Sequence, residues 1–348
     1  MKATVLQATR KITLDDVPDP KIAAPTDAIV KVTASCVCGS DLWPYRGINE
    51  IQEPQRIGHE FVGIVQEVGS EVSTLRTGDF VIAPFTYCDN TCPHCRAGVH
   101  TACDKLGGWG SPDPNGDMVD AGQGEYVRVP MADGTLVATP EPPEESMLPS
   151  LLTLTDVMCT GWHAARSARV SAGHTAVVVG DGAVGLCGVL AASRMGAERI
   201  IAMSRHESRQ KLARKFGATD IVEARGDEGV EAVREMTGGV GADAVLECVG
   251  TAQSMETAFG VLRPGGTVGY VGIPHDIELP IGQMFGRNLN IAGGIAPARA
   301  YLEELRDDVL SGAISPGAVL DQTFALSDVA QAYEAMDERR VIKAMLRP

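Results

Sequence analysis

A glycine-rich loop between an apolar run and a helical pattern limits the fold of this chain more than any other feature. Residues 175–179 form the apolar run, the loop occupies 180–185, and the helical pattern extends over 183–195. Strand and helix patterns continue to alternate after it, at 199–203, 207–216, 244–247, 255–262 and 267–270. Alternation of this kind specifies a parallel sheet covered by helices on both faces. The sequence therefore predicts an α/β fold with a doubly wound parallel sheet.

The residues of the loop indicate what this sheet binds. Gly180 permits a tight turn, Gly182 lets the backbone approach a pyrophosphate, and Gly185 lets the helix pack closely on the strand. Ala183 and Val184 begin the helix, whose first amide groups can receive phosphates. An ordinary glycine turn is the alternative. The strand before the loop and the helix after it favour dinucleotide binding.

The residues after the second strand bear on the choice of dinucleotide. An acidic side chain there usually holds the ribose hydroxyls and repels a 2′-phosphate. This chain has Ser204 and Arg205 instead, with no acid before Glu207. A hydroxyl and a guanidinium can bind phosphate, and His206 and Arg209 can assist. A solvated basic loop is the alternative, but the pattern favours NADP(H) over NAD(H).

Length and charge narrow the class of protein. The 348 residues suit two domains, and 44% hydrophobic residues can supply both cores. A net charge of −15 argues against a nucleic-acid partner. The N-terminus lacks the apolar core of a signal peptide, and no run of about eighteen apolar residues occurs. We expect a cytoplasmic protein with no membrane partner.

The two ends of the chain differ from its middle. Residues 1 to 150 read as short β-runs broken by Gly, Pro and Asp, which predicts a loop-rich β domain. A helix is predicted over 151–164, another over 298–311, and a final strand over 341–346. We expect the C-terminal elements to return to the first domain.

Two short motifs near the N-terminus supply ligands for a metal ion. Cys38 offers a thiolate and His59 an imidazole, while Glu60 can ligate or exchange with an open position. Asp41 is expected to accept the second ring N–H of a ligating histidine. Each residue alone could be a structural polar group. Their joint occurrence favours a catalytic Zn²⁺ site.

A second cluster contains four of the nine cysteines, and its intervals approach those of a closed structural zinc site. Its members are Cys88, Cys92, Cys95 and Cys103. Four thiolates would hold together a loop that has little core of its own. Four reduced cysteines without metal are the alternative.

The order and spacing of these motifs resemble the zinc-dependent alcohol dehydrogenases of the medium-chain dehydrogenase/reductase superfamily, over nearly the whole chain. The resemblance implies a GroES-like catalytic domain from residues 1–152 and 295–348. It implies a Rossmann domain over 153–294, and assembly as a homodimer or homotetramer. The glycine loop, the two metal motifs, the cysteine lobe and residues 155–161 carry this likeness.

The same resemblance assigns roles to further residues. Asp156 falls where some members place another zinc ligand, and Ser40 matches a hydroxyl that passes the substrate proton. Thr160 matches a residue beside the nicotinamide, and Lys343 matches a basic residue that can approach the pyrophosphate. The implied catalytic set is Cys38, Ser40, Asp41 and His59.

This chain departs from the family pattern at two places. Trp43 stands where many relatives carry a histidine, so a proton leaving Ser40 needs another route. Three residues, rather than two, separate the first two cysteines of the lobe, and Asp89 stands where the family has its first cysteine. The alternatives are that Cys88 is the fourth ligand, that Asp89 is the fourth ligand, or that the site is empty.

Together the motifs predict zinc-assisted hydride transfer between an alcohol and an aldehyde or ketone, with a small-molecule substrate. A polyol, sugar or amino-alcohol dehydrogenase on the same scaffold is an alternative. A non-catalytic nucleotide-binding redox sensor is another, since fold does not determine function. A zinc-free quinone or enoyl reductase would not need both Cys38 and His59.

Overall fold

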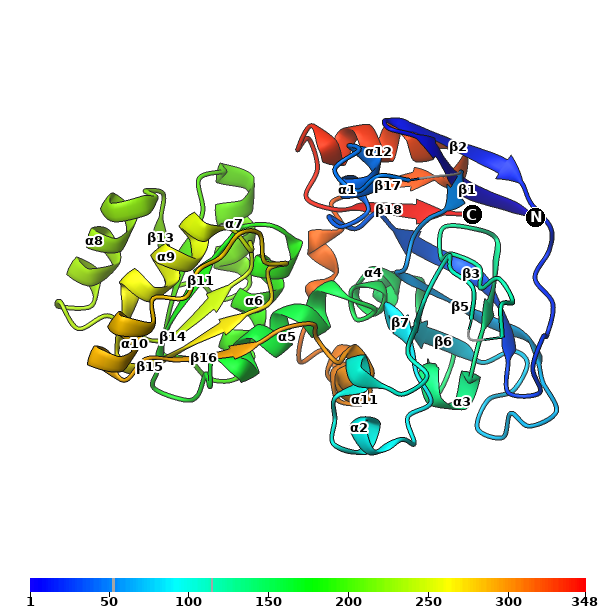
Figure 1. Cartoon of the computed structure of the whole chain (residues 1–348), viewed down its shortest axis with the longest axis horizontal. Helices are drawn as coiled ribbons and strands as arrows, with labels where there is room; N and C mark the ends of the chain where they lie inside the picture. The colour runs from blue at the N-terminus through cyan, green and yellow to red at the C-terminus, as the bar shows by residue number, and fades with distance from the viewer. Residues whose placement is uncertain (52–53, 114) are drawn as a thin grey trace. The chain divides into compact units, whose positions relative to one another are not determined.

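The computed structural model describes residues 1–51, 54–113 and 115–348, which form two compact units (Figure 1). The first unit comprises Met1–Asp156 together with Pro297–Pro348, and the second is the continuous segment Val157–Ala296. The divisions predicted from the sequence are at 152/153 and 294/295. The first unit is thus built from both ends of the chain and the second from its middle.

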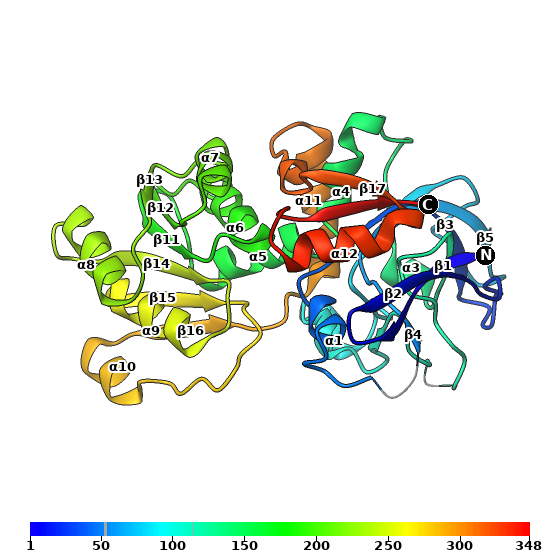
Figure 2. The same ribbon diagram turned by 90° about the horizontal axis from the view of Figure 1, so that it is seen from above.

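The second unit contains a six-stranded sheet in which all neighbouring strands run parallel. Its order is β13-β12-β11-β14-β15-β16, which Figure 2 shows as a row. The strands are β11 (Thr175–Val179), β12 (Arg199–Met203), β13 (Asp220–Val222), β14 (Ala242–Glu247), β15 (Leu262–Tyr270) and β16 (Asn290–Gly293). The order reverses between β11 and β14, as in doubly wound sheets that bind ligands at this switch point. The predicted α/β fold is confirmed.

Helices cover both faces of this sheet. They are α5 (Val157–Ser167), α6 (Ala183–Arg194), α7 (Glu207–Lys215), α8 (Gly226–Met236), α9 (Ala252–Val261) and α10 (Ile281–Arg287). Helix α6 connects β11 to β12, toward one edge of the sheet, and α8 connects β13 to β14, toward the other edge. Because such connections are right-handed, α6 and α8 lie on opposite faces of the sheet. Helix α5 packs against α6, and α9 packs against α8. Val177 and Val178 are both fully buried, as expected for a strand covered on both faces.

The first unit is rich in antiparallel strands. Its largest sheet has the order β10-β6-β5-β3-β18-β17, with β9 also paired to β3. A smaller sheet has the order β2-β1-β4, and β7 pairs with β8. The strands are β1 (Lys2–Ala8), β2 (Lys11–Asp16), β3 (Ala28–Cys36), β4 (Gln55–Arg56), β5 (Phe61–Val68), β6 (Phe80–Ala83), β7 (Thr86–Tyr87), β8 (Gly107–Gly108), β9 (Tyr126–Val129), β10 (Val137–Ala138), β17 (Gln322–Ala325) and β18 (Ala344–Arg347).

Helices join these strands, several of them only four to six residues long. The α-helices are α1 (Leu42–Tyr45), α2 (Pro93–Arg96), α3 (Ala132–Thr135), α4 (Leu148–Thr153), α11 (Ala298–Leu310) and α12 (Val329–Asp337). Single 3₁₀ turns cover His100–Ala102, Glu145–Met147, Pro316–Val319 and Leu326–Asp328. Most of the first unit is therefore sheet and loop, with α11 and α12 supplied by the C-terminal end of the chain.

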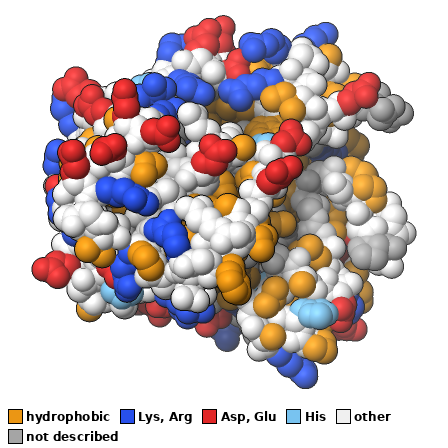
Figure 3. Space-filling view, turned by 60° about the vertical axis from the view of Figure 1, so that its left-hand side comes forward, with side chains coloured by type: hydrophobic (Ala, Val, Ile, Leu, Met, Phe, Trp, Pro, Cys, Tyr) orange, Lys and Arg blue, Asp and Glu red, His pale blue; other side chains and the backbone are white. Residues whose placement is uncertain are grey.

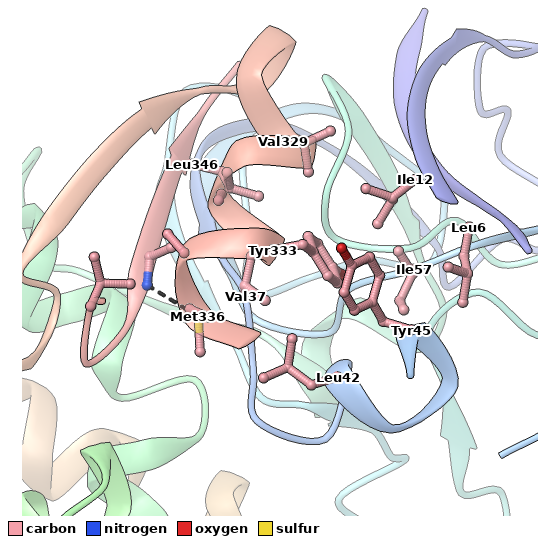
Figure 4. Packing of buried hydrophobic residues seen from close by; sticks show 14 of the residues in the cluster. Leu6, Ile12, Val37, Leu42, Tyr45, Ile57, Val329, Tyr333, Met336 and Leu346 are labelled. Atoms are coloured by element: carbon pink, nitrogen blue, oxygen red, sulfur yellow. Dashed lines mark hydrogen bonds between the residues drawn. The ribbon is translucent and has the colours of Figure 1, made fainter. Parts of the chain in front are cut away.

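The C-terminal residues complete the core of the first unit. β18 pairs antiparallel with β3, where Met345 lies opposite Cys36. Helix α12 contributes Tyr333 and Met336 to a buried cluster that also contains residues of β1, β2 and α1 (Figure 4). The rings of Tyr45 and Tyr333 meet there with centroids 5.3 Å apart. The two ends of the chain therefore share one core.

The helix predicted over 151–164 is wrong as a single element. The structure has α4 ending at Thr153 and α5 beginning at Val157, with a turn between them. The hydroxyl of Thr155 donates to the carbonyl of Leu152, and the amide of Phe85 donates to the carbonyl of Thr155. Because these polar groups bind locally and to a neighbouring segment, they interrupt the helical ladder. The turn contains Asp156.

On the face shown in Figure 3, Lys and Arg side chains are interspersed with Asp and Glu side chains. The described residues of this face thus form no continuous basic surface of the kind that binds nucleic acid.

No helix within residues 1–51, 54–113 and 115–348 combines the length and apolar character that crossing a bilayer requires.

Candidate metal centre

Four side chains of the first unit bring their donor atoms together. Cys38, His59, Glu60 and Asp156 each offer one ligand atom, and these atoms lie within 4.8 Å of one another. The Sγ of Cys38 lies 3.4 Å from Oδ2 of Asp156, and Nε2 of His59 lies 3.6 Å from the same oxygen. The group contains the thiolate, imidazole and carboxylate donors that zinc takes. The structure thus gathers residues separated by more than a hundred positions in the sequence.

Strand pairing explains how the first three of these residues meet. Ser35 of β3 lies opposite Phe61 of β5, so the end of one strand adjoins the start of the other. Cys38 lies two residues after the end of β3, and His59 and Glu60 are the two residues before β5. Because β3 and β5 are antiparallel neighbours, the last residues of β3 lie beside the first residues of β5. The residues that flank these strand ends therefore lie close together.

Asp41 holds the far side of the His59 ring. Oδ1 of Asp41 lies 3.3 Å from Nδ1 of His59, and Oδ2 accepts a hydrogen bond of 2.9 Å from the amide of Cys38. Asp41 is only 4% exposed. With Nδ1 facing a carboxylate, Nε2 of His59 is the nitrogen that faces the donor group.

Lys343 lies against the metal group. Its ammonium is 1% exposed and donates to Oε1 of Glu60 at 2.6 Å and to the carbonyl of Val37 at 3.1 Å. The other oxygen of Glu60 accepts a hydrogen bond of 3.3 Å from Cys36. The family resemblance implies that Lys343 can approach a pyrophosphate. Its buried partner in the structure is instead the Glu60 carboxylate, which the ammonium orients.

Burial and nearby negative charge together set the pKa values of this group. Burial, followed by the nearby Asp156 and Glu60 carboxylates, raises the pKa of the Cys38 thiol. Burial alone would lower the pKa of His59, but the Asp41 and Cys38 charges outweigh it and raise that pKa well above its usual range. Burial and Asp156 also raise the pKa of Glu60, against the effect of Lys343. A divalent cation would relieve this repulsion, so the donor set fits a metal ion.

The cysteine lobe forms a second donor group. Its four ligand atoms, also within 4.8 Å of one another, come from Asp89, Cys92, Cys95 and Cys103. Of the two candidates for the fourth ligand, the structure therefore brings Asp89 into this group. The Sγ of Cys88 lies beside the cluster and points toward the carbonyl of Gly134 at 3.8 Å.

Backbone amides support the thiolates of the lobe. The amide of Cys95 donates to Sγ of Cys92, and the amides of Asp89 and Lys105 donate to Sγ of Cys103. The hydrogen bond from the Cys95 amide is the main cause of a lowered Cys92 pKa, whereas burial raises the pKa of Cys88 to about 11. Burial raises the pKa of Cys95 and of Cys103 as well, so the positions of the donor atoms, and not their pKa values, distinguish Cys88 from the four members of the group.

The glycine loop in the second unit has the conformation its sequence predicts. Gly180 has φ +115°, and a Cβ on Gly185 would lie 2.0 Å from the carbonyl oxygen of Gly180. Only glycine satisfies both conditions. Gly182 caps α6, which begins at Ala183 and Val184, so its first amides are available to phosphate oxygens.

A small polar network stands at the end of β12. Ser204 is 2% exposed and donates to Oδ2 of Asp181 at 2.9 Å, while Arg209 lies 3.1 Å from Oδ1 of the same residue. The sequence predicts that Ser204 binds phosphate, whereas in the structure its hydroxyl donates to the carboxylate of Asp181 in the glycine loop. Arg205 follows it and is exposed.

The remaining predicted residues lie where the motifs put them. Ser40 is partly exposed two residues after Cys38, Trp43 lies in α1, and Thr160 lies partly exposed in α5 of the second unit. Sequence reasoning missed Gln123 and Tyr333, which are buried and contact the Asp41 region. A glutamine flanked by glycines in a loop carries no metal-site pattern, so no signal in one sequence could have identified it.

Comparisons with known proteins agree with this site. The family described as "Alcohol dehydrogenase GroES-like domain" matches residues 24–141, and "Zinc-binding dehydrogenase" matches residues 183–311. The chain is 35% identical to "Zinc-type alcohol dehydrogenase B" of Aspergillus flavus, over 100% of this chain and 81% of that protein. It is 30% identical to "Probable D-xylulose reductase A" of Emericella nidulans, over 98% of this chain and 95% of that protein.

Solved structures show the same architecture. The alcohol dehydrogenase of a Thermus species aligns with a TM-score of 0.92 at 29% identity, over 100% of this chain and 99% of that one. The alcohol dehydrogenase of Aeropyrum pernix aligns with a TM-score of 0.88 at 27% identity, over the full length of both chains. Sequence and fold together place this chain in the zinc-dependent alcohol dehydrogenase family of the medium-chain dehydrogenase/reductase superfamily, a family of oxidoreductases.

Proposed function

We propose that this protein interconverts an alcohol and an aldehyde or ketone, with NADP(H) as the preferred hydride carrier. The observation that carries the proposal is the group of Cys38, His59, Glu60 and Asp156, whose donor atoms converge in one unit. A bound Zn²⁺ would act there as a Lewis acid on the substrate oxygen. A glycine loop suited to a dinucleotide lies in the other unit.

The residues around the metal group have separate tasks in this reaction. Cys38 and His59 would hold the ion, and Asp156 or Glu60 would supply a further oxygen donor. Asp41 fixes the ring of His59. Ser40 accepts the hydroxyl proton of the alcohol, which must then leave through water or ribose hydroxyls because Trp43 cannot carry it.

The preference for NADP(H) is supported by charge at the end of β12. Arg205 is exposed beside the buried Ser204, and no acid occupies the usual ribose-binding position before Glu207. Asp181 accepts a hydrogen bond from Ser204 in this region, and Arg209 pairs with it at 3.1 Å. A 2′-phosphate therefore meets an exposed guanidinium whose charge Asp181 does not cancel.

A polyol or sugar alcohol is the second candidate substrate. The relative from Emericella nidulans is described as a probable D-xylulose reductase, and its similarity covers nearly the whole chain. Such substrates need the same metal chemistry and differ in the lining of the pocket. A substrate panel that contains both simple alcohols and polyols separates the two.

The proposed homodimer or homotetramer has support in the second unit. Among the described residues, β16 pairs with β15 alone and so forms an open edge of the sheet. Large apolar side chains near this edge are exposed: Phe285 by 88%, Ile295 by 70% and Ile281 by 64%. An open edge with exposed apolar residues is suited to a second copy. Light scattering on purified protein measures the assembly directly.

The testing experiment combines metal content with turnover. Protein purified in metal-free buffer is analysed for zinc per chain, and NADPH and NADH oxidation are followed against a panel of aldehydes and ketones. Bound zinc and faster turnover with NADPH support the proposal. Zinc-free protein with full activity contradicts the metal mechanism, and equal rates with both cofactors contradict the NADP(H) preference.

A further inference from the structure

A buried chain of hydrogen bonds leads from His59 to the C-terminal helix α12. Asp41 lies against Nδ1 of His59, and Nε2 of Gln123 donates to Oδ2 of Asp41 at 3.2 Å. The hydroxyl of Tyr333 then donates to Oε1 of Gln123 at 3.1 Å. Gln123 is 1% exposed and Tyr333 is fully buried. This series of hydrogen bonds thus links α12 to the proposed metal ligand His59 through three side chains.

The donor and the acceptor of each hydrogen bond between Tyr333, Gln123 and Asp41 can be identified. Tyr333 can only donate to Gln123 in this geometry, because Oε1 of the amide is an acceptor. The Nε2 group of Gln123 donates both to Asp41 and to the carbonyl of Cys36, at 3.2 Å each. Burial, followed by the charge of Asp41, raises the pKa of Tyr333 well above its usual range, so its hydroxyl stays protonated. The amide of Gln123 therefore has one satisfied orientation.

Backbone hydrogen bonds fix the position of Gln123 relative to the metal group. Its carbonyl accepts from the amide of Thr4 at 2.8 Å, and the amide of the preceding Gly122 donates to the carbonyl of Gly58 at 2.8 Å. Gly58 has φ +106°, and a Cβ there would lie 2.4 Å from Cγ of Gln123. The residue before His59 is thus in direct packing contact with the Gln123 side chain.

Tyr333 is anchored by apolar packing. It lies within the cluster of Figure 4, where its ring meets the ring of Tyr45 and its neighbours include Val37 and Leu42. Val37 and Leu42 flank the segment that carries Cys38 and Asp41. The packing of α12 therefore fixes where the Tyr333 hydroxyl lies relative to that segment.

We propose that Gln123 and Tyr333 are positioning residues for the metal centre. They hold the Asp41 carboxylate against Nδ1 of His59, so that Nε2 faces the ion. This inference rests on the proposed metal function. It assigns a role in metal affinity to a residue on α12, nearly three hundred positions from His59 in the sequence.

The test is Tyr333→Phe, which removes one hydroxyl and keeps the ring. Full-length metal-free protein is titrated with Zn²⁺ against a chelator, and Co²⁺-loaded protein is examined by visible absorption. Cys38→Ser identifies the signals of this site and separates them from those of the lobe. Because partners of metal ligands contribute about 10- to 100-fold to affinity, we expect this more distant change to weaken binding about 3- to 10-fold. Shifted cobalt bands should accompany the loss.

Two further variants make the test specific. Tyr45→Phe removes a phenolic hydroxyl from the same cluster, outside the hydrogen-bond chain, and should leave affinity and cobalt bands unchanged. Gln123→Met keeps the length of the side chain without its amide, and should reproduce the loss seen in Tyr333→Phe.

The outcomes separate the inference from the proposed function. Unchanged affinity and bands in Tyr333→Phe and Gln123→Met overturn the inference while the metal function stands. Equal losses of metal affinity in Tyr333→Phe and Tyr45→Phe also overturn the inference, because they indicate a general effect on packing. Wild-type protein that binds no metal through Cys38 overturns the proposed metal function itself.

Discussion

The two units of this protein build their functional features in different ways. In the first unit, donor atoms come from distant positions such as Cys38 and Asp156, and buried polar side chains orient them. In the second, one continuous loop supplies the feature through backbone conformation, with Gly180 and Gly185 at positions that exclude other residues. A metal centre of this kind depends on side-chain networks, whereas a dinucleotide loop depends on the path of the chain.

This difference predicts that the two units respond differently to substitution. Changes at the metal group should alter turnover and metal content while leaving cofactor binding largely intact. Changes at the end of β12 should alter cofactor choice without altering metal content. A single substitution that changes both metal content and cofactor choice would contradict this difference between the units.

The largest effect is expected for Cys38→Ser. Loss of the thiolate ligand removes a Lewis acid worth several kcal/mol, so kcat should fall by about 10³-fold or more. Binding of NADPH, measured by fluorescence, should change little because the glycine loop is intact. Cys159→Ala, which removes a buried thiol from α5, is the control and should keep turnover. Parallel loss of turnover and NADPH binding in Cys38→Ser would instead show a folding defect.

The next effect concerns the cysteine lobe. Cys95→Ser should remove one zinc per chain and lower the thermal unfolding midpoint by about 5–15 °C, since bound metal stabilises the folded state. Cys88→Ser is the matched control, because Cys88 lies in the same cluster outside the donor group. Metal analysis and calorimetry measure both. Loss of zinc in Cys88→Ser with retention in Cys95→Ser would reverse our assignment.

A smaller effect is expected for Arg205→Ala. A charged hydrogen bond contributes about 1.5–3 kcal/mol, so KM for NADPH should rise about 10- to 100-fold while KM for NADH barely changes. Lys211→Ala removes one positive charge from the neighbouring helix and should leave both values as they were. An equal rise for both cofactors would show that Arg205 does not read the 2′-phosphate.

The smallest effect concerns stability and pH. The Arg46 hydrogen bond, together with the charge of Arg10, lowers the pKa of Asp337 despite the opposing effect of burial. A lowered folded-state pKa stabilises the protein above the unfolded value near 3.8. That contribution is lost as pH falls through the folded value. Asp337→Asn should therefore lower the free energy of unfolding by about 1 kcal/mol at pH 7.

Urea denaturation at a series of pH values measures this effect. The difference between Asp337→Asn and wild type should narrow steadily as pH falls below about 5. Asp16→Asn, which removes an exposed partner of Lys2, should show almost no difference at any pH. A gap for Asp337→Asn that widens in acid would contradict the sign of the shift.

The sequence pattern predicted the bounds of strands correctly where local residues alone decide them. The strands predicted at 175–179 and 199–203 have the bounds of β11 and β12. The final strand, predicted over 341–346, instead begins at Ala344. The amides of Ile342 and Lys343 donate to the Asp321 carboxylate, so the residues before Ala344 do not join the ladder. A side chain distant in sequence decided that boundary.

The sequence by itself determined the chemistry available to this protein. The metal-binding residue types, the glycine loop and the alternating pattern are properties of local order, and they specify the family and both kinds of site. Tertiary structure decided which donors meet. It brought Asp156 to Cys38 through a break between two helices, selected Asp89 over Cys88, and turned Lys343 toward Glu60. Long-range packing fixes these distances, and no local pattern in one sequence records it.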